Sequence, residues 1–193
     1  MITHLSGKLV EKSPTSVVVD CNGIGYFIHI SLHTFSQLTD NEYIKLLTHF
    51  QVKEDAQQLY GFATSSEREI FRLLISVSGI GANTARTMLS SLTPKQVREG
   101  IASEDVALIQ SVKGIGLKTA QRVIIDLKDK VLKIYDIDVS TKTSNNTNKD
   151  EALSALEVLG FVKKQSERVV VKILSQTPDA SVELIIKEAL KNL

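Results

Sequence analysis

The chain has 193 residues, of which 42% are apolar and 23% charged, and its formal net charge is +1. These proportions are typical of soluble globular proteins and exclude a disordered or collagen-like chain. The single cysteine, Cys21, excludes a disulfide framework, and no apolar run is long enough to span a membrane. The first residues do not form a secretory signal, so we expect a cytoplasmic protein without membrane contact.

Residues 1–63 have the pattern of a small β-barrel. Turn residues separate β-branched and aromatic runs, and a short helical-looking stretch interrupts them at 32–38. The clearest runs are residues 17–19, 26–30, 43–52 and 58–62. Five short strands with one helical insertion predict a Greek-key barrel such as an OB fold, with another small β-barrel as the alternative.

Residues 64–135 have a helical pattern and form the only basic part of the chain. Helix starts are predicted at Ser65–Glu69, at Thr93-Pro94 and at Ser103–Asp105. This segment holds eleven Lys or Arg and seven Asp or Glu, which gives a charge of +4. The flanking segments sum to −2 and −1, so an anionic partner is expected to bind the middle segment.

The last part of the chain is predicted to be a tethered helical module. Residues 140–151 contain no apolar side chain, so we expect a flexible linker over 136–150. Residues 151–193 read as about three helices, which Gly160 and Thr177-Pro178-Asp179 separate.

The basic segment contains an internal repeat with seven positions in identical spacing. The first copy is Leu74, Val77, Gly79, Ile80, Gly81, Ala85 and Met88. The second copy, 35 residues later, is Ile109, Val112, Gly114, Ile115, Gly116, Ala120 and Val123. Each copy predicts a helix, a tight Gly-Ile-Gly turn and a second helix.

The start of that second helix is a favourable place for a phosphate, because its free amide groups and its dipole attract anions. Lys118 and Arg122 lie four residues apart, on one helix face. The candidate DNA-binding residues are Gly79, Ile80, Gly81, Asn83 and Thr84 in the first copy, and Gly114, Ile115, Gly116, Lys118, Thr119 and Arg122 in the second.

Other glycine motifs fit less well. A dinucleotide-binding turn needs a third glycine, where this chain has Thr84 and Thr119. A Walker A loop needs Lys directly after Gly, but Leu117 intervenes. The remaining alternative is a helical hairpin whose glycines serve only packing.

The repeat resembles the helix-hairpin-helix motif of sequence-independent DNA-binding proteins. Together with the barrel and the tethered module, it resembles the RuvA family of Holliday-junction-binding proteins over the whole chain, most specifically at 78–85, 113–122 and 151–161. Family members often carry a lysine near Asn83, but this chain has Ala82-Asn83-Thr84 there, so the resemblance implies contacts from backbone amides at the first hairpin.

The resemblance implies a multi-domain β plus α protein: an OB barrel (1–63), a tandem helix-hairpin-helix domain (64–135), a linker and a three-helix module (151–193). It implies a homotetramer or octamer on four-way junction DNA. The implied partners are a RuvB-like hexameric ATPase, which uses the ATP, and a RuvC-like resolvase. No cofactor or metal is implied for this chain.

The resemblance also implies two further sites. Glu54 and Asp55 would form an acidic pin that selects junctions, although a solvated turn is the alternative on sequence alone. Leu156, Leu159 and Phe161 would contact the motor, with core packing as the alternative.

No catalytic constellation is visible in the sequence. The four histidines lie in the barrel segment without a carboxylate cluster. We therefore expect a non-catalytic subunit. The alternatives are a helix-hairpin-helix nuclease or glycosylase, which needs catalytic groups beside the hairpin, and a DNA-structure adaptor without a motor partner.

Overall fold

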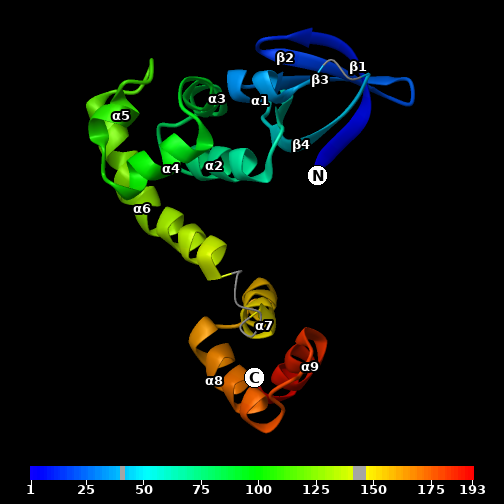
Figure 1. The fold of residues 1–193 in the computed structure, drawn as a ribbon, viewed down its shortest axis with the longest axis vertical. Coiled ribbons are helices and arrows are strands. Elements are labelled where there is room, and N and C mark those ends of the chain that lie inside the picture. Colours follow the sequence, from blue (N-terminus) through cyan, green and yellow to red (C-terminus); the bar gives the residue numbers. More distant parts are fainter. Residues whose placement is uncertain (40–41, 141–146) are drawn as a thin grey trace. The chain divides into compact units, whose positions relative to one another are not determined.

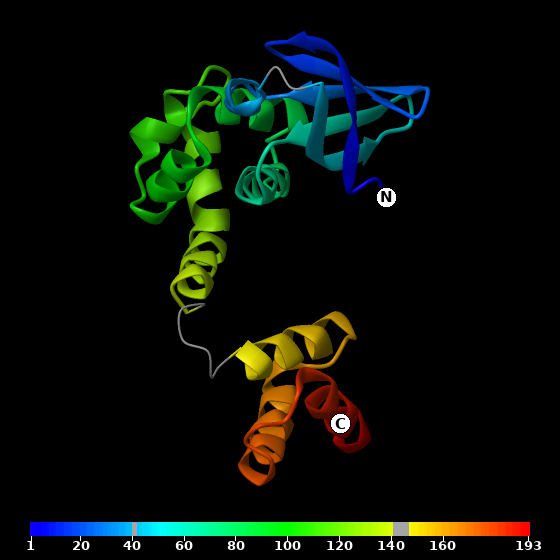
Figure 2. The ribbon, with the colours of Figure 1, turned by 45° about the vertical axis from the view of Figure 1, so that its right-hand side comes forward.

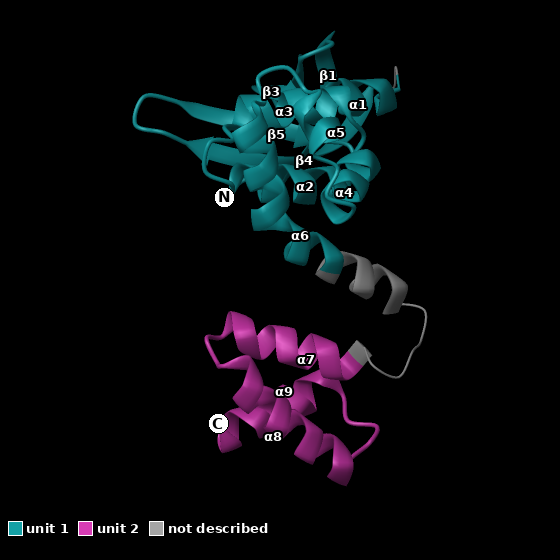
Figure 3. Cartoon of the chain, turned by 90° about the vertical axis from the view of Figure 1, so that its left-hand side faces the viewer, with its two compact units in different colours: residues 1–134 teal, residues 135–193 magenta. Residues whose placement is uncertain are grey.

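The structure is a computed structural model that describes residues 1–39, 42–140 and 147–193. It divides into two units, residues 1–134 and 135–193 (Figure 3). Each unit has its own hydrophobic core and is described by itself. Within the described residues, no helix is long and apolar enough to cross a membrane.

The first unit begins with a closed five-stranded barrel in the order β1-β2-β3-β5-β4. The strands are β1 (His4–Ser13), β2 (Ser16–Cys21), β3 (Ile24–Ile30), β4 (Tyr43–Val52) and β5 (Gln57–Phe62). Strands β3 and β5 pair in parallel and the other neighbours pair antiparallel. Helix α1 (Leu32–Gln37) connects β3 to β4. This topology confirms the predicted OB fold.

The alternation of side chains along the strands builds the barrel core. In β2, Val17 and Val19 are buried, while Val18 between them is only partly buried. They pack with Ile28 of β3 and Leu46 of β4, which are completely buried. Because successive residues of a strand face opposite sides, these runs turn β-branched side chains inward at every second position.

Five helices follow the barrel, and those that are nearest to it lie on one side of it (Figures 1 and 2). They are α2 (Ser65–Ile75), α3 (Ala82–Ser91), α4 (Pro94–Ala102), α5 (Val106–Gln110) and α6 (Leu117–Ser140). The predicted helix starts are confirmed by caps. The Thr64 hydroxyl accepts from Glu67 N, Thr93 forms a capping box with Gln96, and the Asp105 side chain accepts from Leu108 N.

An aromatic cluster joins the barrel to these helices. The Phe71 ring of α2 lies 5.1 Å from that of Tyr60 and 4.9 Å from that of Phe62, measured between centroids. All three side chains are almost completely buried. Packed aromatic rings contribute beyond their buried area, so α2 is fixed to strand β5.

A buried carboxylate also connects α2 to the barrel domain. Glu67 of α2 is fully buried and accepts hydrogen bonds from the hydroxyls of Ser31 and Thr34 beside α1, the latter at 2.6 Å. Each hydroxyl also accepts from a backbone amide, Thr34 N for Ser31 and Ala63 N for Thr34. The hydroxyl protons therefore point to Glu67, and the network requires an acceptor there.

Removing this acceptor should destabilise the first unit. Glu67→Ala leaves two buried donors unpaired, so we expect its free energy of unfolding to fall by about 2–4 kcal/mol. Glu67→Gln keeps the shape and one acceptor, so it should cost less. Urea denaturation followed by tyrosine fluorescence measures this, because three of the four tyrosines lie in the barrel. An Ala variant as stable as the parent would show that the network contributes nothing.

The second unit contains three described helices: α7 (Thr147–Val158), α8 (Lys163–Gln176) and α9 (Val182–Asn192). Helix α7 ends in a Schellman motif at Gly160, whose φ is +95°. Phe161 N donates to Leu156 O and Gly160 N donates to Glu157 O, both at 3.0 Å. This explains why a glycine stands there and how the chain reverses into α8.

The predicted linker over 136–150 is too wide. The structure continues α6 to Ser140 and begins α7 at Thr147, so helix covers both ends of the expected tether. Residues 141–146 lie outside the described residues. The linker was predicted from its lack of apolar side chains. This criterion does not locate the end of a helix, because polar residues also occupy the exposed terminal turns of helices.

Candidate nucleic-acid interface

The two Gly-Ile-Gly turns have the same backbone structure. In the first turn, Ile80 N donates to Val77 O at 3.0 Å, and in the second Ile115 N donates to Val112 O at 3.1 Å. Gly79 and Gly114 adopt φ values of +96° and +93°, a region that side-chain-bearing residues avoid. The spacing of the repeat therefore reflects one hairpin geometry used twice.

The apolar positions of the repeat have the same burial in both copies. Val77 and Val112 are each 2% exposed, and Ile80 and Ile115 are each 5% exposed. Ala85 and Ala120 are fully buried, which lets the paired helices approach closely. Ile80 and Ile115 therefore hold the turns from inside and do not reach a ligand with their side chains.

Each turn leads directly into a helix that is long enough to carry a useful dipole. Gly81 is the N-cap of α3 and makes no side-chain cap, and Gly116 stands just before α6. In the part of the chain that the structure describes, the backbone amides of residues 82–84 donate no hydrogen bond. Free amides at a helix start attract an anion.

The second glycine of each turn is not required by packing or by backbone strain. A Cβ atom at Gly81 or Gly116 would meet nothing within 4 Å, and Gly81 has an ordinary φ of −84°. By contrast, a Cβ atom at Gly7 of the barrel would lie 2.1 Å from the Asp20 carbonyl oxygen. Neither packing nor backbone strain explains Gly81 and Gly116, whereas close approach of an external ligand does.

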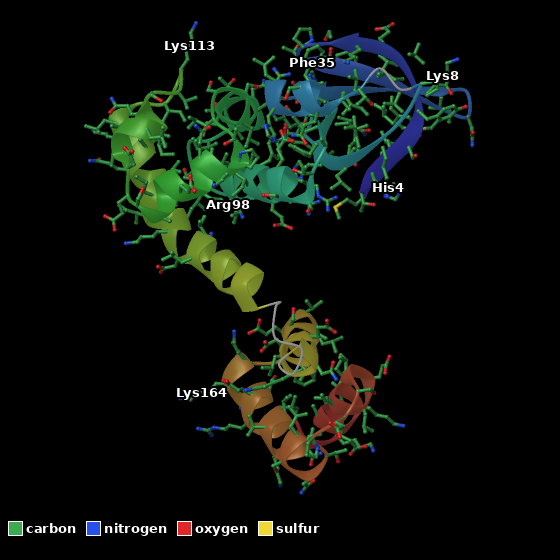
Figure 4. All side chains as sticks on the ribbon, viewed as in Figure 1. His4, Lys8, Phe35, Arg98, Lys113 and Lys164 are labelled. Carbon is green, nitrogen blue, oxygen red and sulfur yellow. The ribbon has the colours of Figure 1, made fainter. Side chains whose placement is uncertain are left out.

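Cations surround the second turn. Lys118 and Arg122 are exposed on α6, as the sequence predicted. Arg122 makes one ion pair with Asp126, at 3.7 Å. Lys113 is also exposed, and its side chain points away from the protein (Figure 4). Lys113 was missed among the candidates because the repeat was defined by apolar and glycine positions, although its place before Gly114 could have identified it.

The first turn is surrounded by neutral residues. Asn83 is exposed and Thr84 is half-buried, so both remain available at the start of α3, and Thr119 holds the corresponding place in α6. The Asn83 side chain also accepts a long hydrogen bond, 3.5 Å, from the hydroxyl of Tyr60 in the barrel.

Arg86 lies in α3, the helix that follows the first turn, and it is hydrogen-bonded to the barrel. Its Nη1 donates to Thr15 O at 3.1 Å and lies 3.4 Å from His29 Nδ1. Burial and the Arg86 guanidinium together lower the pKa of His29, which keeps the imidazole neutral and able to accept. Sequence reasoning could not find this contact because the partners lie 71 and 57 residues apart.

The acidic pair lies where the sequence placed it, between strands β4 and β5. Glu54 and Asp55 are both exposed at the tip of this hairpin. Lys53 N donates to Ala56 O at 2.8 Å, which closes the turn beneath them. Their carboxylates therefore face solvent and are free to act on a nearby charge.

The candidate partner residues differ from one another. Leu156 is completely buried in the core of the second unit, which corrects its assignment as a contact residue. Phe161 is partly buried against that core, and Leu159 is 58% exposed. Val158 and Val162 beside it are 86% and 62% exposed, so the exposed apolar surface centres on the turn between α7 and α8. Leu156 lies in the last turn of α7, where the spacing of apolar residues in the sequence does not show which of them face the core and which face solvent.

Within the described ranges, no three His, Cys, Asp or Glu side chains gather as metal ligands. Cys21 is a free thiol, and its Sγ contacts Ser6 O.

Three family models match the chain in succession. They are the RuvA N terminal domain over residues 1–61, the SAM-like helix-hairpin-helix tandem over 71–129, and the RuvA C-terminal domain over 147–193. The chain is 66% identical over 193 residues to the Holliday junction branch migration complex subunit RuvA of Flavobacterium psychrophilum and 65% identical to that of Christiangramia forsetii, with each chain fully covered. It is 47% identical to that of Bacteroides thetaiotaomicron, again over both full chains. The barrel, the paired hairpins and the C-terminal helices are thus those of a known architecture, and the chain belongs to the RuvA family.

Proposed function

We propose that this chain binds four-way DNA junctions through the backbone phosphates and presents them to a branch-migration motor. The observation that carries the proposal is the pair Gly81 and Gly116, which face open space at two helix starts where neither packing nor backbone strain requires a glycine. The names of the relatives, which are subunits of a Holliday junction branch migration complex, support the same substrate.

The hairpins read backbone and not bases, because amides and lysines at a helix start match phosphate oxygens. Four copies assemble around the junction, so that four acidic hairpin tips meet at its centre, either as one tetramer or as two tetramers in an octamer. The repulsion between carboxylates and phosphates keeps the four arms apart in a square. The exposure of Glu54 and Asp55 supports this role.

The second unit recruits the motor, a RuvB-like hexameric ATPase. An apolar surface on a small module, here Val158, Leu159 and Val162, is suited to partner binding. The motor hydrolyses the ATP, so this chain is a non-catalytic subunit without a cofactor of its own, and it works on chromosomal DNA in the cytoplasm. A RuvC-like resolvase acts on the same junction.

A gel-shift titration tests the proposal. Four-way junction and linear duplex of the same sequences are titrated with the full chain at several salt concentrations, and the mass of the complex is measured in parallel. We expect tighter binding to the junction, by four chains or eight, with no preference among junction sequences. Equal affinity for junction and duplex would refute junction recognition, and a strong base preference would refute backbone reading.

Removing the second unit should separate DNA binding from motor recruitment. A chain that ends at Ser140 keeps the barrel, both hairpins and the complete described α6. We expect unchanged junction affinity, because the described DNA-binding candidates all lie before residue 123, and loss of motor ATPase stimulation. The control is Val158→Ser with Leu159→Ser in the full chain, which removes the apolar surface only. Full branch migration by the truncated chain would contradict the assignment.

A further inference from the structure

The 35-residue repeat allows the two hairpins to be compared position by position. At three pairs of positions around the turns, the two copies differ in charge in the same direction. The pairs are Ser78 with Lys113, Asn83 with Lys118, and Thr87 with Arg122. In every pair the first hairpin carries a neutral hydrogen-bonding side chain and the second carries a cation. The hairpins therefore share one backbone and one core but differ in charge.

Neighbouring residues do not cancel the difference in charge between the two hairpins. Among the described residues, Lys113 and Lys118 have no ion-pair partner, and Arg122 has only the exposed pair with Asp126 at 3.7 Å. Exposed pairs of this kind are weak and exchange readily with a phosphate. In the first hairpin, the half-buried Arg86 is hydrogen-bonded to the barrel, and its counterpart in the second hairpin is the neutral Gln121.

We propose that the two hairpins bind DNA phosphates by different chemistry: the second by charge, and the first by uncharged donors alone. Resting on the proposed function, this inference assigns nearly all of the salt dependence of binding to the second hairpin. A cation that neutralises a phosphate releases condensed counterions, whereas an amide or hydroxyl donor releases none. The contribution of the first hairpin to DNA affinity therefore stays nearly constant as salt rises, while the contribution of the second hairpin falls.

Reciprocal exchange of the paired residues tests the inference. The loss variant carries Lys113→Ser, Lys118→Asn and Arg122→Thr, and the gain variant carries Ser78→Lys, Asn83→Lys and Thr87→Arg. Their affinities for a four-way junction are measured from about 50 to 200 mM salt. Each phosphate contact contributes about 0.9 to the slope of log K against log salt, so three contacts change the salt effect by about 40-fold per bound chain.

We expect the loss variant to have a flatter slope than the parent and the gain variant a steeper one. The matched control carries Lys95→Gln, Lys128→Gln and Lys130→Gln, which remove the same charge from α4 and from the part of α6 beyond the second turn. Its slope should stay close to that of the parent. Ser78→Ala with Asn83→Ala should lower affinity by a similar factor at every salt concentration.

The outcomes separate this inference from the function on which it rests. If the parent binds junctions but the loss variant and the control have equal slopes, the hairpins do not differ as proposed. If the neutral first-hairpin variant loses affinity mainly at low salt, its donors act through charge and the inference is also overturned. A parent that binds no DNA refutes the proposed function itself. Thermal melting verifies that each variant is folded.

Discussion

Replacing Gly81 and Gly116 together with alanine should weaken junction binding by about 10- to 100-fold without destabilising the protein. The added methyl groups would project into open space at the two helix starts, where the proposed function places the phosphate backbone. A loss of this size corresponds to about 1.4–2.8 kcal/mol of binding free energy. Because Gly81 has an ordinary φ, alanine there restricts the unfolded chain, which offsets the cost of losing glycine at the N-cap of α3, so stability should change little.

Two measurements on the same variant decide between ligand approach and packing: a junction titration and a thermal melt. The control is Gly7→Ala, whose Cβ would lie 2.1 Å from the Asp20 carbonyl oxygen, so it should lower the melting temperature strongly. A Gly81/Gly116 variant that melts early but retains its DNA affinity would show that these glycines serve packing. One that matches the parent in both measurements would remove the turns from the interface.

Neutralising the acidic hairpin tip should raise affinity for linear duplex more than affinity for junctions. Glu54→Gln with Asp55→Asn keeps size and hydrogen-bonding capacity while removing two negative charges per chain. In the proposed tetramer, a continuous duplex would cross the centre, where these charges would repel it, whereas an open junction would avoid the centre. The ratio of junction to duplex affinity should therefore fall, and the change should shrink as salt screens the charges.

The measurement is a titration of both DNAs at low and high salt. Glu167→Gln with Asp179→Asn provides the control, because it removes the same charge from exposed positions of the second unit. That control should leave the affinity ratio unchanged. If the neutral tip binds duplex no better than the parent, the acidic hairpin is a solvated turn.

The repeat could be found from the sequence because its determinants are local. Glycine is required at positions 79 and 114 because φ there is near +95°. Apolar residues are required around them because the same positions are buried in both copies. The barrel was predictable for a similar reason, since runs such as Val17–Val19 alternate between inside and outside. Signals of this kind depend on neighbouring residues and need no knowledge of distant partners.

The contacts that join the domains could not be predicted, because their partners are far apart in the chain. Glu67 reads as an ordinary acidic residue in the first turn of a helix, yet it is buried against Ser31 and Thr34. Arg86 reads as a free cation beside the first turn, yet it is bonded to the barrel. Leu156 shows the same limit in the second unit, because only the packing of three helices decides that it faces inward.

The closure of the barrel has a consequence for the order in which the chain folds. Its pairings connect distant segments, such as His4 with Leu47 and Ile28 with Leu59, and contacts of long sequence separation form slowly. The second unit packs three consecutive helices, which is a fast-folding arrangement. Refolding followed by circular dichroism should therefore show a fast helical phase and a slower β phase.

Synthesis from the N-terminus offsets this difference in speed. The last barrel strand ends at Phe62, and 131 further residues of this sequence follow it. At about 5–20 residues per second, synthesis of these residues takes roughly 7–26 s, during which the barrel can close.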